Sequence, residues 1–174
     1  MKAGRPVLTS VSDKVLIIGY GNPLRGDDGL GVRAAALLAE APWSEGARPE
    51  ILCCHQLTPE LAEPVSLAAR VIFIDASCDN SPGTLTCRPV APDSYAAALT
   101  HFAGPAALLA CAEQWYGRRP EAVLYSISGQ DFGPGEELSP VVAAALPALI
   151  QRVFAASAPI PQRAEAIPNQ RNNS

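Results

Sequence analysis

The stretch KVLIIGYGNPLRGDDGLGV, residues 14–32, indicates how the chain folds. It begins with a continuous apolar run that ends at a glycine, a pattern typical of a strand buried on both faces. It then leads into residues 28–40, which are rich in alanine and leucine and are expected to form a helix. A buried strand followed at once by a helix is the first unit of a parallel α/β arrangement.

The same alternation continues along the chain. Apolar runs predict strands at residues 71–75 and 123–127, a shorter strand at 51–54, and an edge strand at 84–88 after the turn residues NSPG. Helical patterns cover residues 58–67, 105–115 and 139–154, and Pro147 is expected to kink or interrupt the last helix. We therefore expect an α/β fold, a three-layer domain with a twisted, mostly parallel central sheet flanked by helices.

We expect one domain with two extensions. The chain has 174 residues, of which 48% are hydrophobic and 17% charged, as is typical of one packed domain. We predict an N-terminal extension at residues 1–13, the α/β domain at 14–154 and a mobile C-terminal tail at 155–174, because the tail has prolines and polar residues without an apolar period.

Charge and hydropathy exclude several classes of protein. The formal net charge of −4 argues against nucleic-acid binding, which requires cations that neutralise phosphates. The early apolar run at 15–18 is far shorter than the ~20 residues that span a bilayer, and no signal-peptide stretch precedes it. The sequence thus predicts a cytoplasmic protein that has no membrane attachment.

The chain has an odd number of cysteines and no Cys-x-x-Cys spacing, which argues against a disulfide framework and a thiolate zinc site. We expect buried, small hydrophobic side chains, with a nucleophilic cysteine as the alternative. The five are Cys53, Cys54, Cys78, Cys87 and Cys111.

The loop after the first strand resembles a dinucleotide-binding loop only at its start. Gly19 and Gly21 match the glycines that let a pyrophosphate approach a helix N-terminus. However, Leu24 stands where the third glycine is required, and Asp27 and Asp28 would repel the phosphates. This loop is therefore not expected to bind a dinucleotide.

Acidic residues follow two of the predicted strands. Asp27 or Asp28 could cap the next helix, and Asp75 could form a turn. Open parallel sheets, however, bind ligands outside the carboxyl ends of their strands. Carboxylates at that edge, together with an imidazole, suggest a site for a divalent metal. From the residues alone, either His55 or His101 could complete such a site.

Four segments, in this order and spacing, resemble the maturation endopeptidases of nickel–iron hydrogenases: GYGNPLRGDDGLGV (19–32), VIFIDASCDNSPGTL (71–85), THFAGPAALLACA (100–112) and LSPVVAAALPALI (138–150). The resemblance extends over about residues 14–153, and its most specific part is the block G-x-G-N-x-L-x-x-D-[DE]-G-x-G. It implies an α/β endopeptidase that removes a C-terminal extension from the hydrogenase large-subunit precursor after nickel insertion.

The resemblance also implies a site. By motif, the metal ligands, which are also the expected catalytic residues, are Asp28, Asp75 and His101. Asp27 is then expected to stabilise the helix or the loop. The nickel is supplied by the precursor, zinc or cadmium is expected to substitute in vitro, and the protein is expected to act as a monomer.

Two segments bear on substrate choice. HQLTPELAE, residues 55–63, is similar to the branch serving cytoplasmic NAD-linked hydrogenases, in which His55 and Gln56 would help to recognise substrate. SISGQDFGPGEELSP, residues 126–140, departs from the more frequent Gly-x-Gln-Pro form of the family.

The mechanism stays open between two routes. The chain lacks G-x-S-x-G and H-E-x-x-H, so a serine triad and an ordinary zinc protease lack support. Either the metal activates a water, or a carboxylate such as Asp28 acts as general base. Asn22 could donate a hydrogen bond to the developing oxyanion or only shape the turn. A non-catalytic, nickel-dependent chaperone of the precursor and a small-molecule binding protein are the alternative functions.

Overall fold

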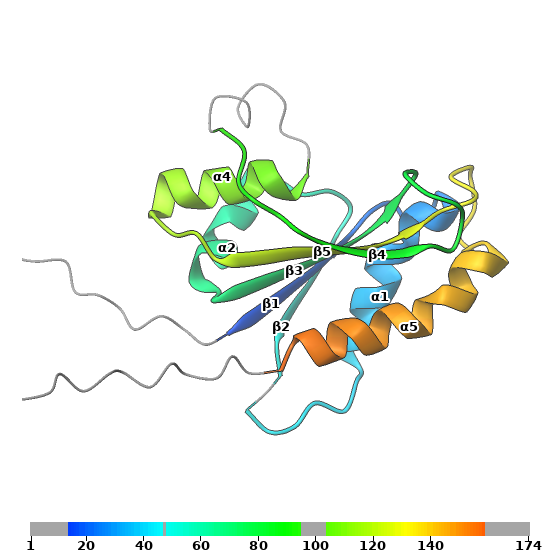
Figure 1. Cartoon of the computed structure of the whole chain (residues 1–174), viewed down its shortest axis with the longest axis horizontal. Helices are drawn as coiled ribbons and strands as arrows, with labels where there is room; N and C mark the ends of the chain where they lie inside the picture. The colour runs from blue at the N-terminus through cyan, green and yellow to red at the C-terminus, as the bar shows by residue number, and fades with distance from the viewer. Residues whose placement is uncertain (1–13, 47, 95–103, 159–174) are drawn as a thin grey trace, which may run out of the picture.

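The computed structural model describes residues 14–46, 48–94 and 104–158. Its five strands form one sheet in the order β2-β1-β3-β5-β4 (Figure 1). Neighbouring strands are parallel except β4, which lies antiparallel to β5 at one edge. The strands are β1 (Val15–Tyr20), β2 (Glu50–Cys54), β3 (Arg70–Ser77), β4 (Leu85–Pro89) and β5 (Glu121–Ser128). The helices are α1 (Leu30–Ala39), α2 (Ala62–Leu67), α4 (Pro105–Tyr116) and α5 (Pro140–Ala156), with short 3-10 turns η1 (Gly26–Gly29) and η2 (Pro59–Leu61).

Helices cover both faces of the sheet, α2 and α4 on one and α1 and α5 on the other (Figure 1). Successive residues of a strand point to opposite faces of the sheet, so each buried strand contributes side chains to two hydrophobic cores. Ile18 and Phe73 pack in the core on the side of α2 and α4. Ile17 and Ile72 pack in the core on the side of α1 and α5. The predicted three-layer α/β fold is confirmed.

All five predicted strands are present, each with both ends within two residues of the expected positions. The predicted helix starts were less accurate, because 3-10 turns precede two of them. The first helix begins at Leu30 instead of residue 28, and the second at Ala62 instead of residue 58. Among the described helices, none has the length and apolar character required to cross a bilayer.

Pro147 does not interrupt the last helix, which runs unbroken from Pro140 to Ala156. A proline removes one backbone donor from a helix. The buried side chains Leu146 and Leu149 hold this part of α5 against the sheet. Packing therefore outweighs the lost hydrogen bond.

The prediction that the cysteines are buried is wrong for most of them. Only Cys111 is buried, Cys54 is half-buried, and Cys53, Cys78 and Cys87 are exposed; all five are free thiols. Cys53 and Cys87 lie on β2 and β4, the two edge strands, which have a neighbour on one side only. Cys78 lies in the segment that follows β3.

Candidate functional site

Two of the predicted site residues lie at the carboxyl edge of the sheet. Asp75 is near the end of β3, and Asp28 lies in η1, just after the neighbouring strand β1. Both line an open cavity of about 420 Å³. The structure therefore brings the two carboxylates together, and their roles as metal ligands and catalytic groups stay predictions.

Close backbone contacts place Asp28 against the strand ends. A side chain at Gly19 would collide with the carbonyl oxygen of Gly31, so α1 can approach β1 only because both residues are glycine. Gly21 has a φ of +131°, and a Cβ there would collide with the carbonyl oxygen of Asp28. These glycines therefore have a structural role, because they allow the close backbone approach that places Asp28 at the sheet edge.

The loop itself is shaped by side-chain to backbone hydrogen bonds. The Asn22 N–H donates to Oδ2 of Asp28 at 3.0 Å, and Oδ1 of Asn22 accepts the N–H of Leu24 at 3.0 Å. The second bond is an Asx turn, so Asn22 shapes the turn. No side-chain hydrogen bond caps η1 or α1, so the alternative that Asp27 or Asp28 caps the helix is wrong.

Asp75 has an environment that disfavours its charge. Burial raises the pKa of Asp75 to about 7, and the nearby charge of Asp28 acts in the same direction. The Tyr20 hydroxyl and the Ala76 N–H, which donates to Oδ1 at 2.8 Å, oppose this shift by hydrogen bonding to the carboxylate. Near neutral pH the carboxyl can therefore take up or release a proton, as a general base or acid must.

Tyr20 is a site residue that the sequence reasoning missed. It ends β1, its hydroxyl hydrogen bonds to Asp75, and it lines the same cavity. Burial, followed by the charge of Asp75, raises the pKa of Tyr20 far above its usual value, so the hydroxyl stays protonated and can donate. A polar aromatic residue between Gly19 and Gly21, at the end of an apolar strand, was the available signal.

Asp27 has a different task from Asp28. Its side chain is fully buried and accepts four hydrogen bonds of 2.7–2.9 Å, from the Gln130 and Asp131 N–H groups and from the N–H and hydroxyl of Ser139. Burial opposes its ionisation, but these hydrogen bonds hold the pKa of Asp27 below its usual value. Asp27 thus holds the first loop, which follows β1, to the segment between β5 and α5 by hydrogen bonds. This agrees with its expected role as a loop stabiliser.

Of the two histidines, His55 can be placed. His55 and Gln56 are exposed and line the cavity that contains Asp28 and Asp75. His101 lies outside the described residues, although Gly104, three residues later, lines the cavity. Within the described ranges, no three His, Cys, Asp or Glu side chains are arranged to hold a metal ion.

No protein-family model and no curated protein sequence matches the chain. Several solved structures do. A hydrogenase 2 maturation peptidase from a Thaumarchaeota archaeon is 26% identical, with a TM-score of 0.60 over 82% of this chain and 97% of that chain. The nickel–iron hydrogenase maturation protease HybD from Thermococcus kodakarensis is 25% identical, with a TM-score of 0.62 over 83% and 99%.

The chain has the fold of the hydrogenase maturation endopeptidases. The hydrogenase maturating endopeptidase HybD from E. coli aligns as well, with 24% identity and a TM-score of 0.61 over 82% of this chain and 91% of that chain. These likenesses confirm the resemblance to hydrogenase maturation endopeptidases that the sequence motifs predict. Placement in the branch that serves cytoplasmic NAD-linked hydrogenases stays a prediction.

Proposed function

We propose that the protein is an endopeptidase that removes the C-terminal extension of a nickel–iron hydrogenase large-subunit precursor. One observation supports this most directly: Asp28 and Asp75 meet at one open cavity. The cavity lies at the carboxyl edge of a sheet whose fold is shared with proteins named hydrogenase maturation proteases. Ligands bind at this edge in open α/β sheets.

The nickel of the precursor is proposed to serve as the recognition element. Asp28 and Asp75, together with His101, would complete its coordination and so select the loaded precursor. Oxygen and nitrogen donors suit Ni²⁺, and the same donors accept zinc or cadmium, which we expect to substitute in vitro.

For bond cleavage, Asp75 has two alternative roles: as a ligand it would help the nickel to activate a water, and off the nickel it would accept the proton itself, because only the metal-free carboxyl has a pKa of about 7. A carboxylate whose pKa is about 7 can take a proton from a water as that water attacks the scissile carbonyl, and can then give it to the leaving amine. Tyr20 donates to the same carboxylate and would hold it in one orientation. The Asp28 carboxylate accepts a hydrogen bond from the Asn22 N–H, which would hold it in place to bind the nickel of the precursor.

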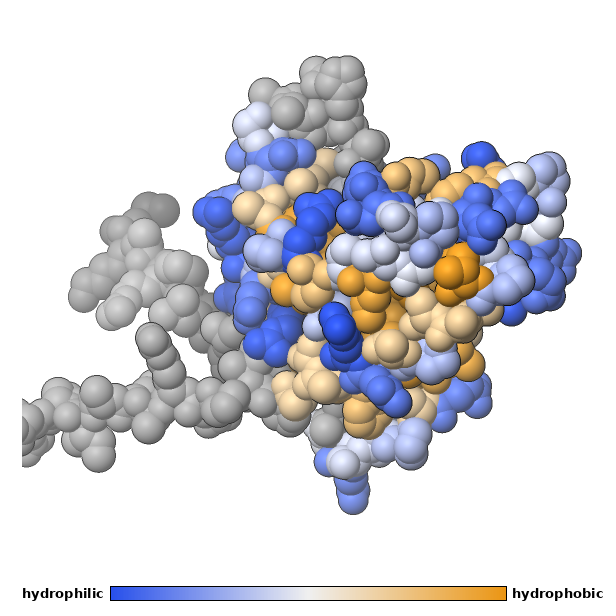
Figure 2. Space-filling view, turned by 45° about the vertical axis from the view of Figure 1, so that its right-hand side comes forward, coloured by the Kyte–Doolittle hydropathy of each residue, from blue (hydrophilic) through white to orange (hydrophobic). Residues whose placement is uncertain are grey.

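We further propose that the protein acts in the cytoplasm as a monomer. The exposed large hydrophobic side chains of the described residues are scattered over the first loop and several helices: Leu24, Leu37, Leu67, Trp115, Tyr116 and Phe154. On the face drawn in Figure 2, hydrophobic and hydrophilic residues are interspersed. Scattered single residues of this kind are usual on monomers, whereas lasting interfaces need a larger contiguous patch.

The test is incubation of the purified protein with nickel-loaded and nickel-free precursor, followed by intact mass spectrometry. We expect a catalytic amount of protein to shorten the loaded precursor only. Asp28→Asn should reduce the rate by at least about 100-fold, because a ligand is lost. Glu113→Gln, an exposed change on α4, is the matched control and should leave the rate unchanged.

Two results would contradict the proposal. Stable binding of the loaded precursor without any shortening would indicate the nickel-dependent chaperone instead. Failure to bind the loaded precursor at all would favour a small-molecule binding protein that uses the same cavity.

A further inference from the structure

The cavity with the two carboxylates continues into a second one. The second cavity, of about 450 Å³, lies over β4 and β5 and shares Tyr20, Asp75 and Gly104 with the first. Each is large enough for a small ligand. A ligand that fills both while passing Asp75 must be extended, as a peptide chain is.

The floor of the second cavity is a row of polar side chains across three strands. Asp75 of β3 lies in register with Ser126 of β5, and Ser126 with Thr86 of β4. The Thr86 and Ser126 hydroxyl oxygens are 2.8 Å apart. Two residues earlier, on the same face, Phe73 and Leu124 belong to the apolar core under α4. The face therefore changes from apolar to polar at this row.

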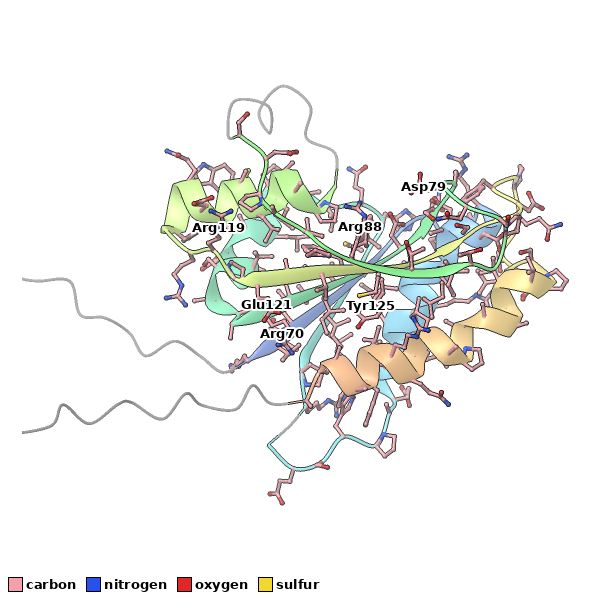
Figure 3. All side chains as sticks on the ribbon, viewed as in Figure 1. Arg70, Asp79, Arg88, Arg119, Glu121 and Tyr125 are labelled. Atoms are coloured by element: carbon pink, nitrogen blue, oxygen red, sulfur yellow. The ribbon has the colours of Figure 1, made fainter. Side chains whose placement is uncertain are left out.

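Arg88 provides the cation of this cavity. It follows Thr86 by two residues and points to the same face of β4. In Figure 3, Arg88 and Asp79 lie on the side of the sheet that α4 covers, whereas Tyr125 lies on the other side. Among the residues that line the second cavity, Arg88 is the single cation, and its charge offsets a small part of the rise in the pKa of Tyr20 that burial and Asp75 cause.

Arg88 has no oppositely charged partner among the described residues. It is exposed, and it forms no ion pair or hydrogen bond with any residue in the described part of the chain. The other charged groups that line the cavity are the acids Asp75 and Asp79. A guanidinium group is suited to bind a carboxylate through two parallel hydrogen bonds.

We propose that the second cavity receives the precursor peptide on one side of the scissile bond, and that Arg88 binds a carboxylate of this peptide. The inference rests on the proposed endopeptidase function and adds a specificity-determining residue to it. The Ser126 and Thr86 hydroxyls can satisfy backbone groups of an extended chain, which must find partners when water is displaced. The carboxylate belongs either to an acidic side chain or to the C-terminus of the precursor.

The experiment measures steady-state kinetics of the full-length chain with nickel-loaded precursor. Arg88→Gln should raise KM about 10- to 100-fold, as expected for the loss of a charged hydrogen bond, and change kcat less than about twofold. Arg88→Lys should raise KM less than Arg88→Gln does, since lysine keeps the positive charge but lacks the planar guanidinium that binds a carboxylate through two hydrogen bonds. Arg119→Gln is the control, because Arg119 lies at the far end of α4 (Figure 3) and should leave both constants unchanged.

Variants of the precursor identify the carboxylate. In one series, each Asp or Glu near the cleavage site is changed to its amide; in another, two glycines are added at the C-terminus. For one of these precursor variants, the KM of the wild-type protein should rise by the same factor as Arg88→Gln causes with the unchanged precursor. With that precursor variant, Arg88→Gln should raise KM no further, because the interaction is already lost.

Three outcomes would overturn the inference: Arg88→Gln leaves KM unchanged, it affects only kcat, or it raises KM by the same factor with every precursor variant. The last two would mean that Arg88 acts through Tyr20 and Asp75. If the wild-type protein leaves the loaded precursor uncut, the proposed function fails and this inference fails with it. Normal cleavage by the wild type with an unaffected Arg88→Gln rejects the inference alone.

Discussion

Asp75→Asn is expected to stop cleavage and, at the same time, to stabilise the protein at pH 8. The carboxylate is held where burial and the Asp28 charge raise its pKa to about 7. The neutral amide avoids this cost, and its oxygen can still accept the Ala76 N–H. It cannot, however, accept a proton from an attacking water. We expect cleavage to slow by about 10²- to 10⁴-fold, the usual contribution of a general base.

The stability effect has a defined pH dependence. Because the folded-state pKa of about 7 lies above the ordinary aspartate pKa of 3.8, the folded protein binds a proton more tightly than the unfolded chain between these values. The free energy of unfolding of the wild type therefore falls as pH rises from about 4 to about 7, and Asp75→Asn lacks this fall. Since Asp75 is partly exposed, we expect a gain on the order of 2 kcal/mol at pH 8, and none near pH 4.

Urea unfolding of both proteins at several pH values measures this difference. Asp79→Asn, an exposed aspartate just after β3, should have the stability of the wild type throughout and serves as the control. A variant that is less stable than the wild type at pH 8, or a difference that does not change with pH, would show that the environment of Asp75 does not disfavour its charge.

Much of this site follows from features that are local in the sequence. An apolar run predicts each central strand, and the carboxyl ends of β1 and β3 meet at one edge because the strands are parallel neighbours. Asp28 and Asp75, each at or just after such an end, were therefore expected to come together. The strand patterns placed both acids at this edge of the sheet, whereas the adjacency of β1 and β3, which brings them to one cavity, comes from the structure.

The features that the sequence did not reveal depend on contacts between distant residues. The partners of Asp27 lie 103 to 112 positions away, so no local pattern connects them. The exposure of Cys53 and Cys87 depends on β2 and β4 being the edges of the sheet, which only the strand order decides. The pairing of Tyr20 with Asp75 likewise requires knowing that β1 and β3 are adjacent.

Asp27→Asn is expected to have the opposite effect on stability from Asp75→Asn. Oδ2 of Asp27 accepts three hydrogen bonds and Oδ1 accepts one, so both oxygens face donors in the buried side chain. An asparagine must turn its NH₂ group toward at least one of these donors. We expect the free energy of unfolding to fall by about 3–5 kcal/mol at pH 7, as when one member of a buried charged network is removed.

The pH dependence again follows from the direction of the shift. The pKa of Asp27 is lower in the folded protein than its ordinary value of 3.8, so its contribution to stability is complete above that value and is lost as pH falls through the folded-state pKa. The difference between wild type and Asp27→Asn should therefore be largest near neutral pH and shrink in acid. Urea unfolding measures it, and hydrogen exchange should be faster at the Gln130, Asp131 and Ser139 amides in the variant.

Asp131→Asn provides the matched control in the same loop. Its side chain is exposed, and Oδ1 accepts only the N–H of Gly133, at 2.8 Å. The amide oxygen of asparagine can accept that bond equally well, so the loss should stay below about 1 kcal/mol. If Asp131→Asn cost as much as Asp27→Asn, the loop would be sensitive to any change. The four hydrogen bonds to Asp27 would then not explain why the first loop is held to the start of α5.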